Sequence, residues 1–267
     1  MGWELVICTY NVMLTVPEPI RFNGQLERAK RIPFAIANIN TNIDVIVFVE
    51  LTVKHTRTLI INEMKKLGWL YSSQVISPST CYNNLKLVSG GVVIVSKYPI
   101  IYEDTYIFKS ACEGYDCLAS KGIVFCKISK NGNIFNIAGT HFQAWDTPSS
   151  NKIRRLQALE YSTYINSRSI PEHEPLILAG DLNIDFYTKQ CEIKTISKIM
   201  KVEILKRKRN SFQFTSDPST NTLVGNDDCT MYTTDRYPGG CYDEYMSSLV
   251  CPCCPQEWLD YIAFSTS

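Results

Sequence analysis

Two carboxylates and an amide lie at the ends of apolar runs in this sequence. Asn11 lies in CTYNV, Glu50 closes VIVFVEL, and Asp181 follows LILAG in GDLN. Side chains at the ends of different strands can converge on one site. A sparse set of carboxylate and amide oxygens suits Mg²⁺, which keeps several waters and takes its other oxygens from a substrate phosphate. Together the motifs predict a magnesium site for phosphate chemistry, whereas Asn11 or Glu50 alone is better explained as a strand-end cap.

Further polar residues accompany these motifs. AGTHFQAWD places His141 and Gln143 after an apolar run, and GDLN places the Asn183 amide two residues beyond Asp181, so that both can point into one cleft. Asp260 lies in EWLDYIAFS, inside a run that is otherwise apolar. We therefore expect one site built from the ends of several strands.

Short apolar runs alternate with helical patterns along the chain. The predicted strands are rich in Val, Ile, Phe and Tyr and cover residues 3–10, 44–49, 91–96, 122–128, 134–139, 176–179 and 258–264. Helical periodicity covers residues 25–39, 52–67, 151–166 and 190–200, with Pro33 interrupting the first. The fourth and fifth strands form a predicted hairpin, because Asn131-Gly132 accepts the positive φ angles of a tight turn.

No repeat, linker or change of composition divides the chain. With 267 residues, of which 45% are hydrophobic, it can bury a full core and is not expected to be disordered. We predict a single α/β domain over residues 1–267, in which two β-rich halves, before and after about residue 130, form two sheets with helices outside.

The balance of charge excludes a strong general attraction to nucleic acid, because the formal net charge is only +1. No apolar run approaches the ~18 to 20 residues that span a bilayer, and the start of the chain lacks the basic-then-apolar pattern of a signal peptide. We expect a soluble monomer that is cytoplasmic or peripherally bound to a membrane, with no transmembrane segment.

The eleven cysteines follow no regular disulfide framework. Cys8 and Cys126 lie in apolar runs and are expected to be buried thiols. Two clusters, ACEGYDC with Cys112 and Cys117 and a C-terminal group, are close enough in sequence to form disulfides or to hold a metal. The second cluster consists of Cys241, Cys251, Cys253 and Cys254. Because CPCC lacks the paired spacing and nearby histidine of a zinc site, reduced loop thiols are the favoured interpretation of both clusters.

The motifs TYNV, FVEL, GTHFQAWD, GDLN and LDYI, in this order, resemble the endonuclease/exonuclease/phosphatase superfamily. Within it, GGVVIVSKYPI and LASKGIVFCKISKNGNIFNIAGTHFQAWD are similar to the neutral and bacterial sphingomyelinases, in which an SKG segment precedes a THxQA motif. The resemblance covers nearly the whole chain. It implies a DNase-like fold of four layers, a two-sheet β-sandwich flanked by helices, and Mg²⁺-dependent hydrolysis of sphingomyelin to ceramide and phosphocholine.

The resemblance also implies a role for each motif residue. Glu50 would be the principal Mg²⁺ ligand with help from Asn11, and Asp181 would orient or deprotonate the attacking water. Asn183 would hydrogen-bond a phosphoryl oxygen, and His141 would donate to the phosphoryl group or protonate the leaving oxygen. Substrate-binding roles would fall to Lys121 of SKG, as a positive charge near the phosphate, and to Gln143 of THFQA.

One part of the family pattern is missing. In the family the LDY strand, which here carries Asp260, is followed by a Ser-Asp-His motif whose histidine is the general base, and no such motif precedes the end of the printed sequence. His55 and His173 match no motif, so surface or helix-packing roles are expected for both. We expect a truncated chain that lacks the final catalytic segment, and an Asp260 carboxylate without its hydrogen-bonding partner. The alternatives are another residue acting as base, or a relative that binds without turnover.

Two other functions remain open. A Mg²⁺-dependent nuclease on the same scaffold would use the basic run at residues 206–209, although a solvated charge run is the usual explanation and nucleic acid is an unlikely partner. A lipid-binding protein without catalysis would need no general base. Membrane contact through tyrosines at residues 232–245 is a further possibility, and ordinary loop packing is the favoured explanation of that segment.

Overall fold

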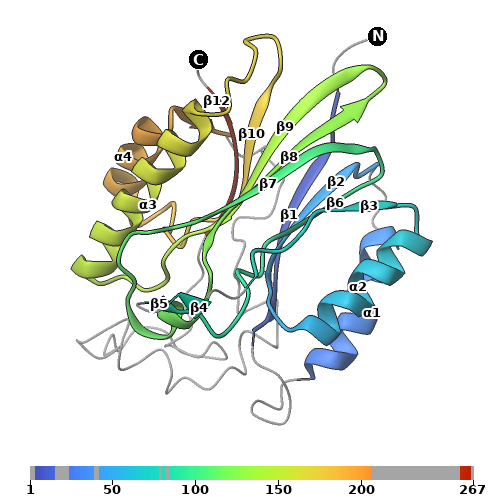
Figure 1. Cartoon of the computed structure of the whole chain (residues 1–267), viewed down its shortest axis with the longest axis horizontal. Coiled ribbons are helices and arrows are strands. Elements are labelled where there is room, and N and C mark those ends of the chain that lie inside the picture. The colour runs from blue at the N-terminus through green and yellow to red at the C-terminus, as the bar shows by residue number, and fades with distance from the viewer. Residues whose placement is uncertain are drawn as a thin grey trace, which may run out of the picture.

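The computed structural model describes residues 4–15, 24–38, 42–77, 80–81, 84–205 and 259–265. Within these residues two β-sheets face each other, with a pair of helices on the outer side of each (Figure 1). The result is a four-layer α/β sandwich, as the sequence predicts. The tyrosine-rich segment, the basic run and the C-terminal cysteine cluster lie outside the described residues.

The first sheet has the strand order β1-β2-β6-β3. These strands span Ile7–Leu14, Val45–Leu51, Val93–Ser96 and Tyr71–Ser72. It is covered by α1 (Gln25–Asn38) and α2 (Lys54–Lys66). Pro33 is buried inside α1 and does not end the helix. A separate short hairpin joins β4 (Thr80–Cys81) to β5 (Asn84–Leu85).

The second sheet has the strand order β11-β12-β10-β9-β8-β7. In chain order these strands span Ile100–Ile107, Gly122–Lys130, Asn133–His141, Leu176–Asp181, Val202–Ile204 and Asp260–Ser265. The covering helices are α3 (Pro148–Asn166) and α4 (Gln190–Met200). The short 3₁₀ helix η1 (Gly114–Leu118) follows β7. The β8–β9 hairpin is confirmed, with φ of 53° at Asn131 and 80° at Gly132.

The predicted division of the sheets near residue 130 is wrong. The second sheet already begins with β7, which the sequence analysis did not identify as a strand. The chain therefore crosses from one sheet to the other between β6 and β7. The cause of the error is that β7 is an edge strand with mostly exposed or half-buried side chains, so it lacks the continuous apolar run of the inner strands.

Three hydrophobic clusters fill the spaces between the four layers. One lies between the sheets and contains Val47, Ile94 and Ile137. Another joins the first sheet to α1 and α2, and the third joins the second sheet to α3 and α4. Each inner strand is thus apolar on both faces over most of its length. No helix in the described part of the chain is long and apolar enough to cross a membrane.

The cysteines differ in part from expectation. Cys126 is buried and Cys8 is half-buried, both as free thiols. Cys112 and Cys117 form a disulfide, so the interpretation of this pair as reduced loop thiols is wrong. The bond closes a short loop around η1, where the two cysteines are only five residues apart.

Candidate metal and phosphate site

The site lies where two pairs of parallel strands end. β1 and β2 run parallel, with Asn11 opposite Val49, the residue before Glu50. β9 and β10 also run parallel, with His141 opposite Asp181 at their last residues. The carboxyl ends of parallel strands share one edge of a sheet, so each pair brings two of these side chains together. Contacts of β1 with β10 and of β2 with β9 bring the two edges together.

Strand alternation turns most of these side chains into the space between the sheets. Ile137 and Ala179 pack in the cluster between the sheets, and His141 and Asp181 follow them at even spacing on the same face. The sequence predicted Asn11 just after the first strand, but it lies inside β1. Its side chain is on the face of the first sheet that is turned toward the second sheet.

Alternation alone would turn Glu50 toward the helices, because Phe48 packs against α1 and α2. A left-handed backbone conformation at Glu50, with φ of 59°, breaks the alternation. Gly91 supports this conformation from the neighbouring loop: its own φ is 72°, and a Cβ there would lie 3.2 Å from the Glu50 Cα. A left-handed conformation costs a residue other than glycine about 1–2 kcal/mol. Strain of this kind persists where the surroundings enforce it and is common at functional sites.

The GDLN segment uses residues that tolerate unusual backbone angles. Gly180 has φ of 149°, and a Cβ there would lie 2.0 Å from the Thr140 carbonyl oxygen, so β9 and β10 approach closely only because this residue is glycine. Asn183 has φ of 51°, which asparagine adopts readily. Its N–H donates to Asp181 Oδ1 at 2.7 Å, and its Nδ2 donates to the Phe142 carbonyl oxygen at 3.0 Å.

The Asn11 amide bridges the two carboxylates. Its Nδ2 donates to Glu50 Oε1 at 2.8 Å and to Asp181 Oδ2 at 3.0 Å, while its Oδ1 accepts from the Met13 N–H at 3.0 Å. Burial raises the pKa of Glu50, the hydrogen bond from Asn11 lowers it, and the charge of Asp181 raises it again. Two acids this close in a partly buried place favour binding of a cation between them.

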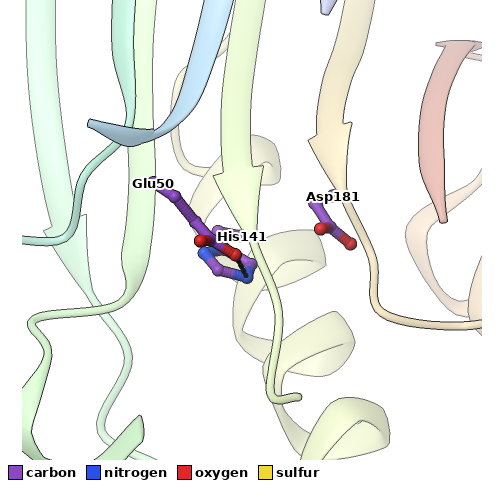
Figure 2. Close-up of side chains that lie close together, drawn as sticks. All are labelled: Glu50, His141 and Asp181. Atoms are coloured by element: carbon purple, nitrogen blue, oxygen red, sulfur yellow. Dashed lines mark ion pairs between the residues drawn. The ribbon is translucent and has the colours of Figure 1, made fainter. Parts of the chain in front are cut away.

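The donor set fits a hard divalent cation. Ligand atoms of Glu50, His141 and Asp181 lie within 4.8 Å of one another, and Figure 2 shows that they converge from three strands. The His141 Nε2 to Glu50 Oε1 distance is 4.0 Å. Carboxylate oxygens such as those of Glu50 and Asp181 are the donors that Mg²⁺ prefers, whereas an imidazole suits transition metals. Asn11 turns its Nδ2 toward both carboxylates here, so it would become a ligand only after the amide exchanges its nitrogen and oxygen. The residues present therefore fit Mg²⁺ held by oxygen atoms, with His141 free for another role.

Lys121 is buried beside His141. Its Nζ donates to Asp116 Oδ2 and to the Phe142 carbonyl oxygen, both at 2.6 Å, and lies 3.2 Å from His141 Nε2. Burial and the charge of Lys121 hold the pKa of His141 well below its usual value. A neutral imidazole beside an ammonium group presents Nε2 as the acceptor. The site thus has an acidic side, with Glu50, and a basic side, with Lys121.

Gln143 is occupied with the backbone of a neighbouring loop. It is fully buried, its Oε1 accepts from the Glu113 N–H and its Nε2 donates to the Glu113 carbonyl oxygen, both at 3.1 Å. The buried Arg154 then holds the carbonyl oxygens of Gln143 and Trp145 and forms an ion pair with Glu192. Gln143 and Arg154 together fix the loop that follows His141.

The other predicted residues lie at the margin of the site or far from it. Asp260 is opposite Asp181 in the β10–β12 register and is the first residue of its strand. It interacts with other groups, and burial together with the charge of Asp260 raises the pKa of the nearby Cys8 thiol. His55 on α2 and His173 in a loop are exposed, as expected.

Sequence reasoning missed Asp116. Its Oδ2 accepts from Lys121 Nζ and from the Ala144 N–H, at 2.6 and 2.7 Å, and so links η1 to the segment after β9. The available signal was an acid close to Lys121, inside the segment between Cys112 and Cys117. Neither the spacing nor the apolar pattern marks that loop as part of the site.

Comparison with known proteins shows which family the chain resembles. The Endonuclease/Exonuclease/phosphatase family profile matches residues 8–238. Phospholipase C of Staphylococcus aureus is 33% identical over 234 residues, which cover 83% of this chain and 68% of that protein. Sphingomyelinase C 1 of Leptospira interrogans is 31% identical over 212 residues, which cover 75% of this chain and 34% of that protein. The chain therefore spans only about a third of the length of the Leptospira relative.

Among solved structures, a mutant beta toxin of Staphylococcus aureus with bound magnesium ions superposes with a TM-score of 0.75. Its sequence is 30% identical, and the match covers 97% of this chain and 82% of the toxin chain. The fold, the order of the motifs and the match over most of the sequence lead to one conclusion. The chain belongs to the endonuclease/exonuclease/phosphatase family.

Proposed function

We propose that the protein is a Mg²⁺-dependent phosphodiesterase that hydrolyses sphingomyelin to ceramide and phosphocholine. The observation that carries the proposal is the Asn11 amide that bridges Glu50 and Asp181, two carboxylates delivered by different sheets. Two carboxylates held this close together are suited to hold a divalent cation beside a phosphate. The names of the relatives, sphingomyelinase C and phospholipase C, support a phospholipid as the substrate.

Different residues would bind the metal ion and the phosphate of the substrate. Glu50 and Asn11 would hold Mg²⁺. A bound divalent cation supplies positive charge that stabilises the phosphoryl oxygens during an in-line displacement. Lys121 would add a fixed charge on the other side of the phosphate, because its buried ammonium group cannot be screened by water.

Asp181, Asn183 and His141 would act on the reacting atoms. Asp181 orients or deprotonates the attacking water, whose oxygen bonds to phosphorus as the bond from phosphorus to the ceramide oxygen breaks. The proton lost by the water passes to Asp181 and on to solvent, and the ceramide oxygen takes a proton from solvent. Asn183 uses one amide hydrogen on Phe142, which leaves the second for a phosphoryl oxygen. His141 hydrogen-bonds the phosphoryl group or the leaving oxygen.

The substrate implies where the enzyme works. Sphingomyelin resides in membranes, so we propose that the protein acts as a peripheral monomer at a membrane surface. Asp260, opposite Asp181, is proposed as a further catalytic residue, and Gln143, whose side chain holds the Glu113 backbone, as part of the substrate-binding site.

The test is phosphocholine release from sphingomyelin vesicles by the 267-residue chain, with Mg²⁺ and with chelator. We expect release only with Mg²⁺, loss of Mg²⁺ binding by calorimetry in Glu50→Ala, and a kcat lowered by about 10² to 10⁴ in Asp181→Ala and His141→Ala. The matched control is Glu27→Ala, which removes an exposed carboxylate from α1. Release that persists in chelator or in Glu50→Ala would contradict the proposal.

Two further readouts separate the alternatives. Plasmid nicking without phosphocholine release would assign the same site to a nuclease. Binding of Mg²⁺ and of sphingomyelin vesicles without release of phosphocholine would identify a lipid-binding protein. Both results would be compatible with Mg²⁺ binding at Glu50 and Asp181 and would change only the proposed activity.

A further inference from the structure

Three large apolar side chains are exposed on one rim of the site. Leu87, Tyr115 and Leu118 are 57%, 73% and 41% exposed. A single exposed apolar residue is ordinary, but a group of them beside a site is informative. The two segments that carry them are joined, because the Val88 N–H donates to the Leu118 carbonyl oxygen at 3.0 Å.

The rim is rigid. Tyr115 lies inside the loop closed by the Cys112–Cys117 disulfide. Two residues before Tyr115, the Glu113 backbone is held at both its N–H and its carbonyl oxygen by the Gln143 side chain. A side chain on a constrained loop loses little conformational entropy when it binds. The exposure of Tyr115 is therefore a fixed property of this loop.

The rim is next to the site. Asp116, the neighbour of Tyr115 in sequence, accepts a hydrogen bond from Lys121, which contacts His141. In Figure 1 the β4–β5 hairpin, which ends two residues before Leu87, lies at the end of the sandwich opposite the β8–β9 turn. That is the end at which β9 delivers His141.

A positive charge completes the rim. Lys86 precedes Leu87, its side chain is half-buried, and its Nζ lies 3.9 Å from Cys112 Sγ. Lysine beside exposed tyrosine and leucine is the composition of protein surfaces that enter a lipid interface, where the apolar groups reach the acyl boundary and the ammonium group meets phosphates.

We propose that Lys86, Leu87, Tyr115 and Leu118 form a docking rim that enters the surface of a bilayer containing anionic lipid and holds the site against it. This inference rests on the proposed function for the identity of the substrate, but not for the binding of the rim to lipid. The rim adjoins Lys121, so docking would place the phosphate of a lipid headgroup at the site without extracting the lipid from the membrane.

The experiment measures co-sedimentation of the protein with phosphatidylcholine and sphingomyelin vesicles, with and without phosphatidylserine, in chelator to prevent turnover. We expect Tyr115→Ser/Leu118→Ser to lower the apparent affinity at least tenfold, and Lys86→Glu to remove the gain from phosphatidylserine. Leu159→Ser on α3, which removes a leucine that is 51% exposed against 41% for Leu118, should bind as the parent does. Parent-like binding by the double variant, or no binding by the parent, would overturn the proposal that this rim docks on a bilayer.

A second measurement separates this inference from the proposed function. In Mg²⁺, the double variant should hydrolyse the water-soluble diester bis(4-nitrophenyl) phosphate at the parent rate while losing activity on vesicles. If the parent hydrolyses neither substrate, the proposed function fails, and the co-sedimentation result still decides the rim. Quenching of Tyr115→Trp fluorescence by brominated lipid, above the background of the four native tryptophans, checks that the loop enters the bilayer; quenching no greater than that of the parent would also overturn the rim.

Discussion

The two sheets deliver their site residues by different means. In the second sheet, alternation carries His141 and Asp181 to the site, and the unusual backbone angles fall on Gly180 and Asn183. In the first sheet the unusual angles fall on Met13 and Glu50, residue types that adopt them at a cost. Trp145, in the loop after His141, also has a positive φ of 76°. The comparison teaches that Glu50, the proposed metal ligand, carries backbone strain itself, whereas His141 and Asp181 depend on close packing around them.

The largest expected effect is on the packed side. Arg154→Met would leave Glu192 as an unpaired buried charge and release the carbonyl oxygens of Gln143 and Trp145, at a cost of about 3–5 kcal/mol in the free energy of unfolding. Urea denaturation measures this. Arg168→Met, which breaks the more exposed pair with Asp104, should cost less than about 1 kcal/mol. Equal losses of unfolding free energy in the two variants would contradict the larger structural role given to Arg154.

Gly180→Ala tests how closely β9 and β10 must approach. A Cβ 2.0 Å from the Thr140 carbonyl oxygen forces the strands apart, so we expect a loss of about 3 kcal/mol and weaker Mg²⁺ binding. Gly132→Ala, at a positive φ with open space around it, isolates the backbone cost and should lose only about 1 kcal/mol. A Gly180 variant as stable as this control would show that the strands can separate freely.

Gly91→Ala tests the strained side. We expect a loss of about 2 kcal/mol, because the new Cβ adds a close contact with the Glu50 backbone to the cost of a positive φ. Gly24→Ala has a similar φ and nothing within 4 Å, so the difference between the two variants measures the contact with Glu50. Calorimetric Mg²⁺ affinity should fall only in Gly91→Ala.

The smallest expected effect has the opposite sign. Glu50→Asn replaces a strained, partly buried carboxylate with a residue that adopts left-handed angles readily, so stability should be unchanged or higher by up to about 1 kcal/mol while Mg²⁺ binding is lost. Asp181→Asn should show no gain, since the backbone of Asp181 is not strained in this way. A clear loss of stability in Glu50→Asn would place the strain elsewhere.

The same contrast explains what the sequence could predict. Short apolar runs rich in Val, Ile, Phe and Tyr predicted most strands, and the motifs at their ends identified Asn11, His141 and Asp181 as a group. Glu50 was assigned to the site from its motif, but its direction could not be inferred, because alternation would turn it toward the helices. A left-handed residue is invisible to patterns that assume a regular strand.

Contacts that depend on tertiary packing could not be predicted from the sequence either. Asp116 contacts Lys121 only because η1 folds back on the segment after β9, and no local pattern encodes that contact. Strand β7 was missed because its edge position removes the apolar signal, and this displaced the predicted boundary between the sheets. Pairing of Cys112 with Cys117 was one of several open possibilities until the loop geometry was known.

The bridge through Asn11 has a consequence for folding. Its hydrogen bond to Asp181 joins residues 170 positions apart, whereas its bond to Glu50 spans 39. Contacts of such long range form late, because the entropy of closing the chain must be overcome before they contribute. A chain in which only one sheet has folded would present only half of the ligand set. A cation that binds Glu50 and Asp181 together would therefore stabilise the state in which the two sheets are packed against each other. Titration with Mg²⁺ would then raise the midpoint of global unfolding without speeding the early steps.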